Sequence, residues 1–191
     1  RFQKAMQDMD ETIYKVIHQR RQDRDSGDLL SMLIQAEDEA DGSSMNDKQL
    51  RDEVATLMIA GHETTANTLA WTWMLLSEYP QVQYKLLAEL EEVLNVRSPS
   101  IEDIPRLRYT EMVIKEAMRL YPPVPMIPRK AVADTEIDGY SIPAGCVLIM
   151  SQWVMHRHPR YFSEPLTFIP ERWRDNFEKT LPRGIYFPFG D

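Results

Sequence analysis

The stretch Ala60-Gly61-His62-Glu63-Thr64-Thr65 says most about the fold of this 191-residue sequence. It lies in the middle of a run from Asp47 to Tyr79 that contains no proline and is followed by Pro80. The run predicts one helix over 47–79, about 50 Å long at about 1.5 Å per residue. Its apolar residues fall on more than one helical face, which is typical of a helix inside a large protein core.

The hexapeptide 60–65 breaks local rules in the middle of this helix. Glycine costs about 1 kcal/mol relative to alanine in a helix interior, and broken local rules often mark function. Gly61 would let a flat group approach the backbone, and the Thr64 hydroxyl would bond a carbonyl one turn back and loosen the helix. Glu63 would then relay protons. The alternative is that Glu63 and Thr64 lie on a wet face and Gly61 only relieves crowding, and the hexapeptide by itself leaves both open.

The segments around this helix predict a mainly α protein with a small β region, an α+β class. Asn46 and Gln49 form a capping box at the start of the long helix. Turn signals at Asp138-Gly139 and Pro143-Ala144-Gly145 separate two strand-like runs. The periodicity of apolar residues predicts further helices over 1–22, 28–39, 81–94 and 110–121. The two strand-like runs predict strands over 127–132 and 146–151. The last 40 residues are expected to be rich in loops.

The charge and the cysteine content of the chain disfavour or exclude several kinds of partner and binding site. Twenty-two Lys+Arg against 30 Asp+Glu give a net charge of −8, so nucleic acid is not expected as a partner. The basic residues Lys15, Arg20, Arg21 and Arg24 are diluted by Asp23 and Asp25 and are interpreted as a solvated helix face. Cys146 is the single cysteine, which excludes intramolecular disulfides and multi-thiolate metal sites. No apolar run in the sequence reaches the roughly 18 residues of a membrane span.

Two histidine patterns suggest metal sites and are disfavoured. His62-Glu63 begins like the zinc-protease pattern H-E-x-x-H, but position 66 is alanine, so a metal hydrolase is the weakest hypothesis. His156 and His158 are separated only by Arg157 and have no acid or thiol nearby in the sequence. We expect this pair to lie in an exposed turn.

A carboxylate–guanidinium network is predicted near the end of the helix at 110–121. Glu116 and Arg119 are three residues apart, so their side chains share a helical face and can pair. The later segment Pro170-Glu171-Arg172-Trp173 supplies a further arginine, whose planar fork can bind two acceptors.

Four motifs in this order resemble the cytochrome P-450 haem-thiolate monooxygenases. They are Ala60-Gly61-x-Glu63-Thr64-Thr65, Glu116-x-x-Arg119, Pro170-Glu171-Arg172-Trp173 and Phe187-Pro188-Phe189-Gly190. The resemblance covers essentially all 191 residues, from the helix before the oxygen-binding helix to the start of the haem-binding loop. It implies that 1–191 is a partial single domain, a fragment without the N-terminal helices and the end of the haem loop.

The resemblance implies a role for each matching residue. Ala60, Gly61 and Thr64 would form the oxygen-activation groove over haem b, with Glu63 and Thr64 as the acid–alcohol pair that delivers protons. Arg129 would bind a haem propionate.

The remaining matches concern the haem loop. Glu116, Arg119 and Arg172 would be scaffold that holds the haem-loop region in place. Phe189 would open the signature Phe-x-x-Gly-x-Arg-x-Cys, so the cysteine ligand is expected beyond Asp191. Cys146 does not lie in such a loop.

The function implied by the resemblance is hydroxylation of a small apolar organic substrate by a haem-dependent monooxygenase. Dioxygen and two electrons from an electron-donor protein, either a ferredoxin or a flavin reductase, would be needed, and the fragment alone would be inactive. A soluble bacterial enzyme of the cytoplasm is expected, with a membrane anchor before Arg1 left open. The alternative is a helical protein-interaction module without catalytic activity, whose apolar long helix docks against another chain. The sequence does not identify the substrate, because most pocket-forming segments lie outside it.

Overall fold

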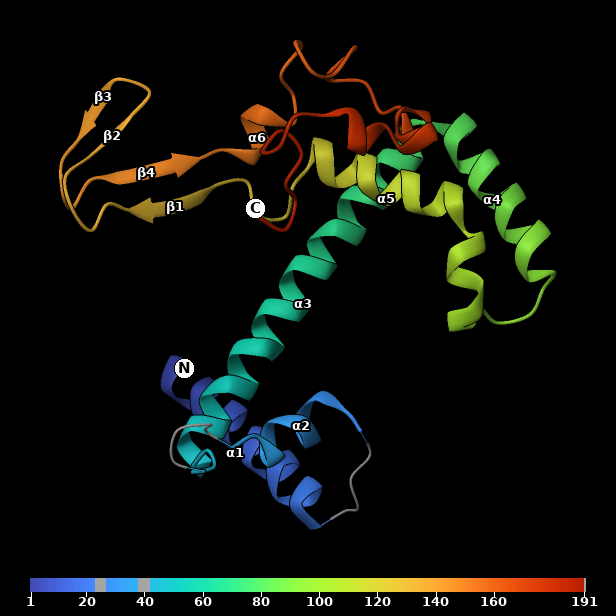
Figure 1. The fold of residues 1–191 in the computed structure, drawn as a ribbon. Helices are drawn as coiled ribbons and strands as arrows, with labels where there is room; N and C mark the ends of the chain where they lie inside the picture. The colour runs from blue at the N-terminus through green and yellow to red at the C-terminus, as the bar shows by residue number, and fades with distance from the viewer. Residues whose placement is uncertain (23–26, 38–41, 191) are drawn as a thin grey trace. The chain divides into compact units, whose positions relative to one another are not determined.

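The computed structural model describes residues 1–22, 27–37 and 42–190, and helices dominate them (Figure 1). The mainly α prediction with a small β region is therefore confirmed. In chain order the described elements are α1 (Phe2–Gln22), α2 (Leu29–Gln35), α3 (Asp47–Glu78), α4 (Pro80–Leu94), η1 (Ile101–Arg106), α5 (Arg108–Leu120), β1 (Ile127–Lys130), β2 (Thr135–Ile137), β3 (Tyr140–Ile142), β4 (Val147–Met150), α6 (Gln152–Met155) and η2 (Pro170–Thr180).

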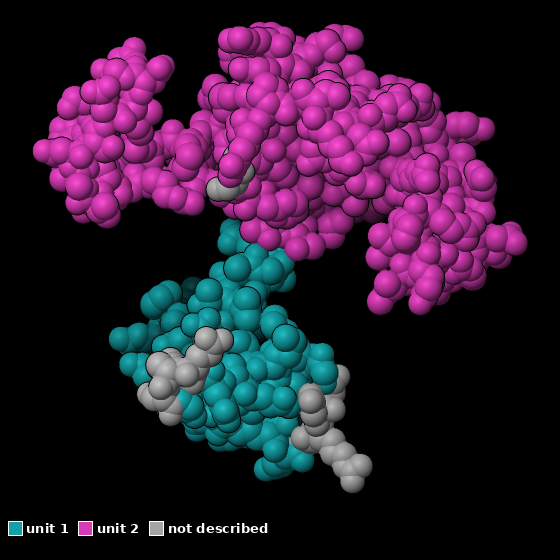
Figure 2. Space-filling model, viewed as in Figure 1, with its two compact units in different colours: residues 1–63 teal, residues 64–191 magenta. Residues whose placement is uncertain are grey.

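The chain divides into two compact units, Arg1–Glu63 and Thr64–Asp191 (Figure 2). The boundary falls inside α3, the long helix predicted over 47–79. The predicted capping box is present, because Asn46 N–H donates to Gln49 Oε1 and Gln49 N–H donates to Asn46 Oδ1, both at 3.0 Å. Pro80 does more than end α3: it is the first residue of α4, where its missing N–H costs nothing.

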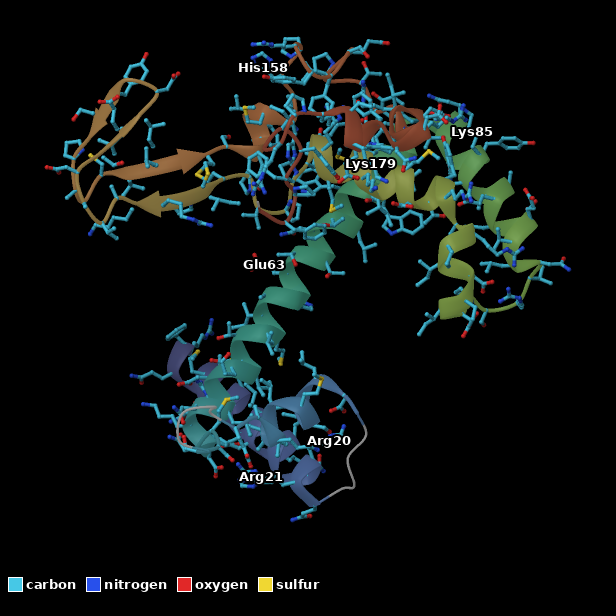
Figure 3. All side chains as sticks on the ribbon, in the orientation of Figure 1. Arg20, Arg21, Glu63, Lys85, His158 and Lys179 are labelled. Carbon is cyan, nitrogen blue, oxygen red and sulfur yellow. The ribbon has the colours of Figure 1, made fainter. Side chains whose placement is uncertain are left out.

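The first unit packs α1 and α2 against the start of α3. The apolar stripe of α1 buries Ile13 and Ile17 against Leu50 and Ala55. The basic end of α1 is exposed or half-buried, as predicted, but two of its arginines also join helices (Figure 3). Ion pairs of 2.6 Å and 2.7 Å link Arg20 to Asp28 and Arg21 to Asp47. Residues 23–25, which belong to the predicted basic face, lie outside the described residues.

Helix α2 is shorter than the predicted range 28–39. Asp28 caps it by accepting from Ser31 N–H at 2.9 Å. The helix ends at Gln35, and residues 38 and 39 lie outside the described part of the chain.

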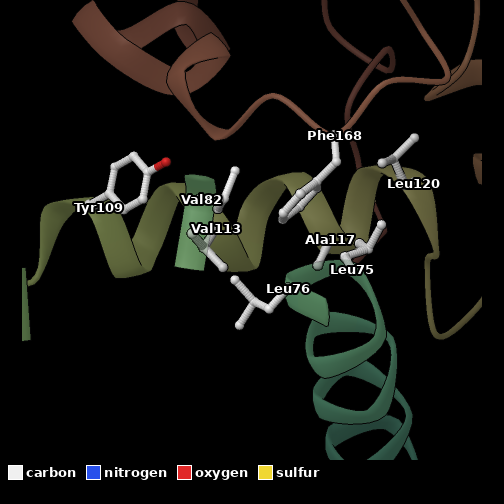
Figure 4. Close-up of a cluster of buried hydrophobic side chains, with 8 residues drawn as sticks. All are labelled: Leu75, Leu76, Val82, Tyr109, Val113, Ala117, Leu120 and Phe168. Atoms are coloured by element: carbon white, nitrogen blue, oxygen red, sulfur yellow. The ribbon is translucent and has the colours of Figure 1, made fainter. Parts of the chain in front are cut away.

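The main core of the second unit forms around α5 (Figure 4). Its buried residues Tyr109, Val113, Ala117 and Leu120 recur every three or four positions, so they share one face. They pack with the last turns of α3, the start of α4 and one loop residue. The cluster comprises Leu75, Leu76, Val82, Tyr109, Val113, Ala117, Leu120 and Phe168.

The predicted turns organise the β region. Strands β2 and β3 form a hairpin whose turn residues, Asp138 and Gly139, have φ of 51° and 81°. Gly145, with φ of 87°, lies in the second turn, which is closed by Cys146 N–H donating to Pro143 O at 3.1 Å. Strands β1 and β4 pair antiparallel, which places Arg129 opposite Leu148.

The last 40 residues contain more order than the loop-rich prediction suggests. Phe162, Trp173 and Ile185 form a second buried cluster beside α5 and η2. Tyr161, Phe177 and Tyr186 pack against this cluster, so several aromatic residues of the segment build a core. None of the helices in the described ranges is both long and apolar enough to cross a membrane.

Candidate functional site

A buried carboxylate–guanidinium network lies on α5. Glu116 and Arg119 are both 0 % exposed. Arg119 Nε donates to Glu116 Oε2 and Arg119 Nη2 donates to Oε1, each at 2.9 Å. Two parallel bonds between a planar guanidinium and a carboxylate make a strong, directional pair.

Each partner of this pair also binds backbone or side chains far along the chain. Arg119 donates to the carbonyls of His156 at 2.8 Å, Pro165 at 2.7 Å and Thr167 at 3.2 Å. Glu116 accepts from the N–H of Ile169 at 3.1 Å. These bonds satisfy the buried charges and tie the segment 156–169 to α5.

The motif at 170–173 joins the same network. Arg172 Nε lies 3.4 Å from Glu116 Oε1, a long contact, while Trp173 Nε1 donates to Oε2 at 2.9 Å. The sequence reasoning selected Arg172 and missed Trp173, although the tryptophan makes the shorter bond. Glu171 faces another way and binds Lys85 and the Tyr109 hydroxyl.

His156 is buried, so the expectation of an exposed His156–His158 turn is wrong for the first histidine. His158 is exposed, but His156 is 0 % exposed, and its Nε2 accepts from Phe187 N–H at 3.0 Å. Two residues on a helical turn point to different sides, and one of these sides faces the aromatic core. Burial lowers the pKa of His156 to about 4, and the nearby charge of Arg119 adds to this effect.

The hexapeptide 60–65 lies in a regular part of α3. Ala60, Gly61 and Glu63 are exposed and Thr64 is half-buried, and a Cβ added at Gly61 would meet nothing within 4 Å. Figure 3 labels Glu63 midway along the helix. The helix is continuous from Asp47 to Glu78, and the role expected of the Thr64 hydroxyl stays a prediction.

A cavity of about 340 Å³ lies between the β1–β4 pair and the end of the chain. Arg129 contributes a positive charge to a lining that is otherwise apolar or small. Phe187 lines it, and Phe189, two residues on, is 89 % exposed. The full lining is Ile127, Arg129, Ile149, Met150, Ser151, Met155, Gly184 and Phe187.

The chemistry of these residues decides what the cavity fits. Apolar side chains with one arginine suit a group that has an apolar body and an anionic edge, as haem has. Within the described residues, no group of three or more His, Cys, Asp or Glu is placed to bind a metal ion, and Cys146 is exposed. In charge and polarity, the lining around Arg129 therefore suits an amphipathic group of this kind.

Comparisons with known proteins identify the family to which the chain belongs. The family model described as Cytochrome P450 matches residues 1–191, and the chain belongs to the cytochrome P450 family. It is 41 % identical over 191 residues to the cyclooctat-9-en-7-ol 5-monooxygenase of Streptomyces melanosporofaciens, and 33 % identical over 191 residues to the pentalenene oxygenase of Streptomyces avermitilis. In both cases the match covers 100 % of this chain and 42 % of the relative. The chain thus spans less than half the length of these relatives.

A solved structure shows the same fold. The cytochrome P450DA heme domain superposes with a TM-score of 0.85 at 32 % identity, over 96 % of this chain and 41 % of that domain. The match confirms the resemblance that the four sequence motifs indicated.

Proposed function

We propose that residues 1–191 are part of a single catalytic domain of a haem-dependent monooxygenase that hydroxylates a small apolar organic substrate. Membership of the cytochrome P450 family supports this proposal. The observation that carries it is the cavity in which Arg129 meets the apolar residues of β1 and β4. An amphipathic cofactor with negatively charged edges is what such a lining recognises.

Haem b is the cofactor in this proposal. Arg129 would bind a propionate, and Ile127, Ile149 and Phe187 would contact the apolar ring. By the family resemblance, Ala60 and Gly61 would belong to the groove over the haem. A Cβ added at Gly61 would meet nothing within 4 Å, so a flat group could approach the backbone there. When bound through a thiolate, the iron supplies the activation of dioxygen that side chains lack.

Glu63 and Thr64 are the proposed proton path. The Glu63 carboxylate is exposed, so it can exchange protons with solvent, and Thr64 Oγ1 would pass one proton inward. Adjacent residues on a helix do not face each other, so a water molecule must link the two side chains. Glu116, Arg119 and Arg172 take no part in this transfer and act as scaffold.

The names of the relatives point to the substrate class. Two of them are named as oxygenases of cyclooctat-9-en-7-ol and pentalenene, an alkenol and an alkene by name. We propose a substrate of this apolar kind, with dioxygen and two electrons from a ferredoxin or a flavin reductase. The two Streptomyces relatives support a bacterial setting, and a cytoplasmic location is part of the proposal.

The test is the absorption spectrum of the full-length protein that contains these residues. After reduction and addition of carbon monoxide, we expect the band typical of a thiolate-ligated haem. A purified, folded protein without bound haem would contradict the proposal. That result would favour the interaction module, in which exposed apolar residues on more than one face of α3, such as Leu57, Ile59 and Trp73, would contact the partner.

A further inference from the structure

Two side chains, those of Gln152 at the start of α6 and of His156 at its C-cap, hold the backbone of one residue, Phe187. Gln152 Nε2 donates to the carbonyl of Phe187, and His156 Nε2 accepts from its N–H at 3.0 Å. Gln152 and His156 are four residues apart, which places them on one side of the same short helix. Both are 0 % exposed. Neither belongs to the four motifs that carry the sequence resemblance.

The chemistry of this clamp requires a specific form of each side chain. The carbonyl of Phe187 is an acceptor, so Gln152 must present its amide nitrogen. The N–H of Phe187 is a donor, so His156 must be neutral and unprotonated at Nε2. Gln152 Oε1 is buried and has no hydrogen-bond partner among residues 1–22, 27–37 and 42–190. Burying an amide of which only the nitrogen is hydrogen-bonded reduces the stability of the fold. The bond to Phe187 therefore accounts for the presence of a glutamine at position 152.

Phe187 connects the buried network to the cofactor cavity. On one side, Arg119 binds the carbonyl of His156 at 2.8 Å, so the clamp is joined to the Glu116–Arg119 pair. On the other side, Phe187 lines the cavity with Arg129. The same Phe187 carbonyl accepts from Gly190 N–H at 3.1 Å, which closes the turn 187–190.

We propose that Gln152 and His156 are positioning residues that fix the backbone of Phe187 and thereby orient the 187–190 turn at the wall of the haem cavity. This inference rests on the proposed function. Both the N–H and the carbonyl of Phe187 are held, so the backbone of this residue is restricted in translation and in rotation. The aromatic ring of Phe187 adds an edge contact to the His156 ring, with centroids 5.3 Å apart.

The test compares four variants of the full-length haem protein. Gln152→Met keeps the side-chain length and removes the donor, and His156→Leu removes the acceptor. His156→Gln places an amide oxygen at a similar reach and is the rescue variant. His158→Leu is the matched control, because His158 is exposed and two residues away. The readout is the ratio of thiolate-type to non-thiolate-type absorption of the reduced carbon monoxide complex, with helix content measured by circular dichroism.

We expect Gln152→Met and His156→Leu to lower this ratio about tenfold, with helix content unchanged. His156→Gln should restore most of it, and His158→Leu should match the wild type. Wild-type ratios in both Gln152→Met and His156→Leu would overturn the clamp, as would failure of both to fold, because the two side chains would then be general scaffold. Lack of rescue by His156→Gln would also contradict it. A wild-type protein without the thiolate-type band would instead overturn the proposed function.

Discussion

Glu116 and Arg119 form a doubly hydrogen-bonded ion pair with no solvent exposure, with each oxygen of the carboxylate 2.9 Å from a guanidinium nitrogen. Buried charges stabilise a fold only when their remaining hydrogen-bonding capacity is used. Here backbone carbonyls accept hydrogen bonds from Arg119, and Trp173 donates one to Glu116.

Glu116→Ala should abolish folded, haem-loaded protein. Removing the carboxylate leaves the Arg119 charge buried without its partner, at a cost of about 3–5 kcal/mol. Expression yield and haem content of the full-length protein measure the effect. Glu111→Ala is the control, because Glu111 lies on the same helix with its side chain 64 % exposed. Normal holoprotein yield from Glu116→Ala would show that the pair is dispensable.

Trp173→Phe should reduce the free energy of unfolding by about 1–3 kcal/mol. The variant retains most of the ring packing and loses the 2.9 Å bond from Nε1 to Glu116, which leaves a buried acceptor short of a donor. Trp153→Phe, at a residue that is 45 % exposed, is the control. Chemical denaturation compares the two variants, and equal losses would assign the effect of Trp173 to packing alone.

Acid should destabilise the protein through His156. Burial lowers its pKa to about 4 in the folded state, while an unfolded histidine has a pKa near 6.5. Between these values the unfolded chain binds more protons, so stability falls as the pH decreases from about 6.5 to about 4, by up to about 3 kcal/mol.

Neighbouring charges do not mimic this effect of acid. Arg119, Arg157 and Tyr186 lie near the ring of His156. Burial lowers the pKa of Arg157 only to about 10 and raises that of Tyr186, so both keep their charge state across the window. His156→Gln should flatten the pH dependence of unfolding, while His158→Gln should not. An unchanged slope in His156→Gln would assign the acid sensitivity to other groups.

Arg129→Ala should weaken haem binding by the full-length protein about tenfold, as expected for the loss of a charge-assisted hydrogen bond. Lys130→Ala is the control, because Lys130 follows on the same strand and points to the opposite face. Haem transfer to apomyoglobin measures the affinity. Equal affinities of the two variants would remove Arg129 from the cofactor site.

Thr64→Ala should preserve substrate binding and divert reducing equivalents to hydrogen peroxide. Loss of a positioned proton donor typically costs about 10²–10⁴ in the step it serves. Thr65→Ala, at an exposed neighbour, is the control. The ratio of product formed to electrons consumed is the measurement, and an unchanged ratio would exclude Thr64 from the proton path.

Local patterns in the sequence predicted most of the helices and turns. The capping box at Asn46 and the proline at position 80 delimit α3 to within one residue, because both act on the backbone within one turn. The Asp138-Gly139 signal predicted the hairpin, since a tight turn needs two residues with positive φ. The ion pair of Glu116 and Arg119 follows equally from a spacing of three on one helix.

Only the tertiary structure decided which residues act across long separations. His156 and His158 are indistinguishable in the sequence, yet one is buried against Phe187 and the other is exposed. Trp173 binds Glu116 from 57 positions away, and Gln152 binds Phe187 from 35 positions away. Periodicity and turn chemistry encode contacts between near neighbours, whereas burial and partner choice depend on which distant segments pack together. The sequence alone therefore determined most of the helices and turns, the family resemblance and the motif residues. The packing of residues 152–190 against one another determined the clamp on Phe187.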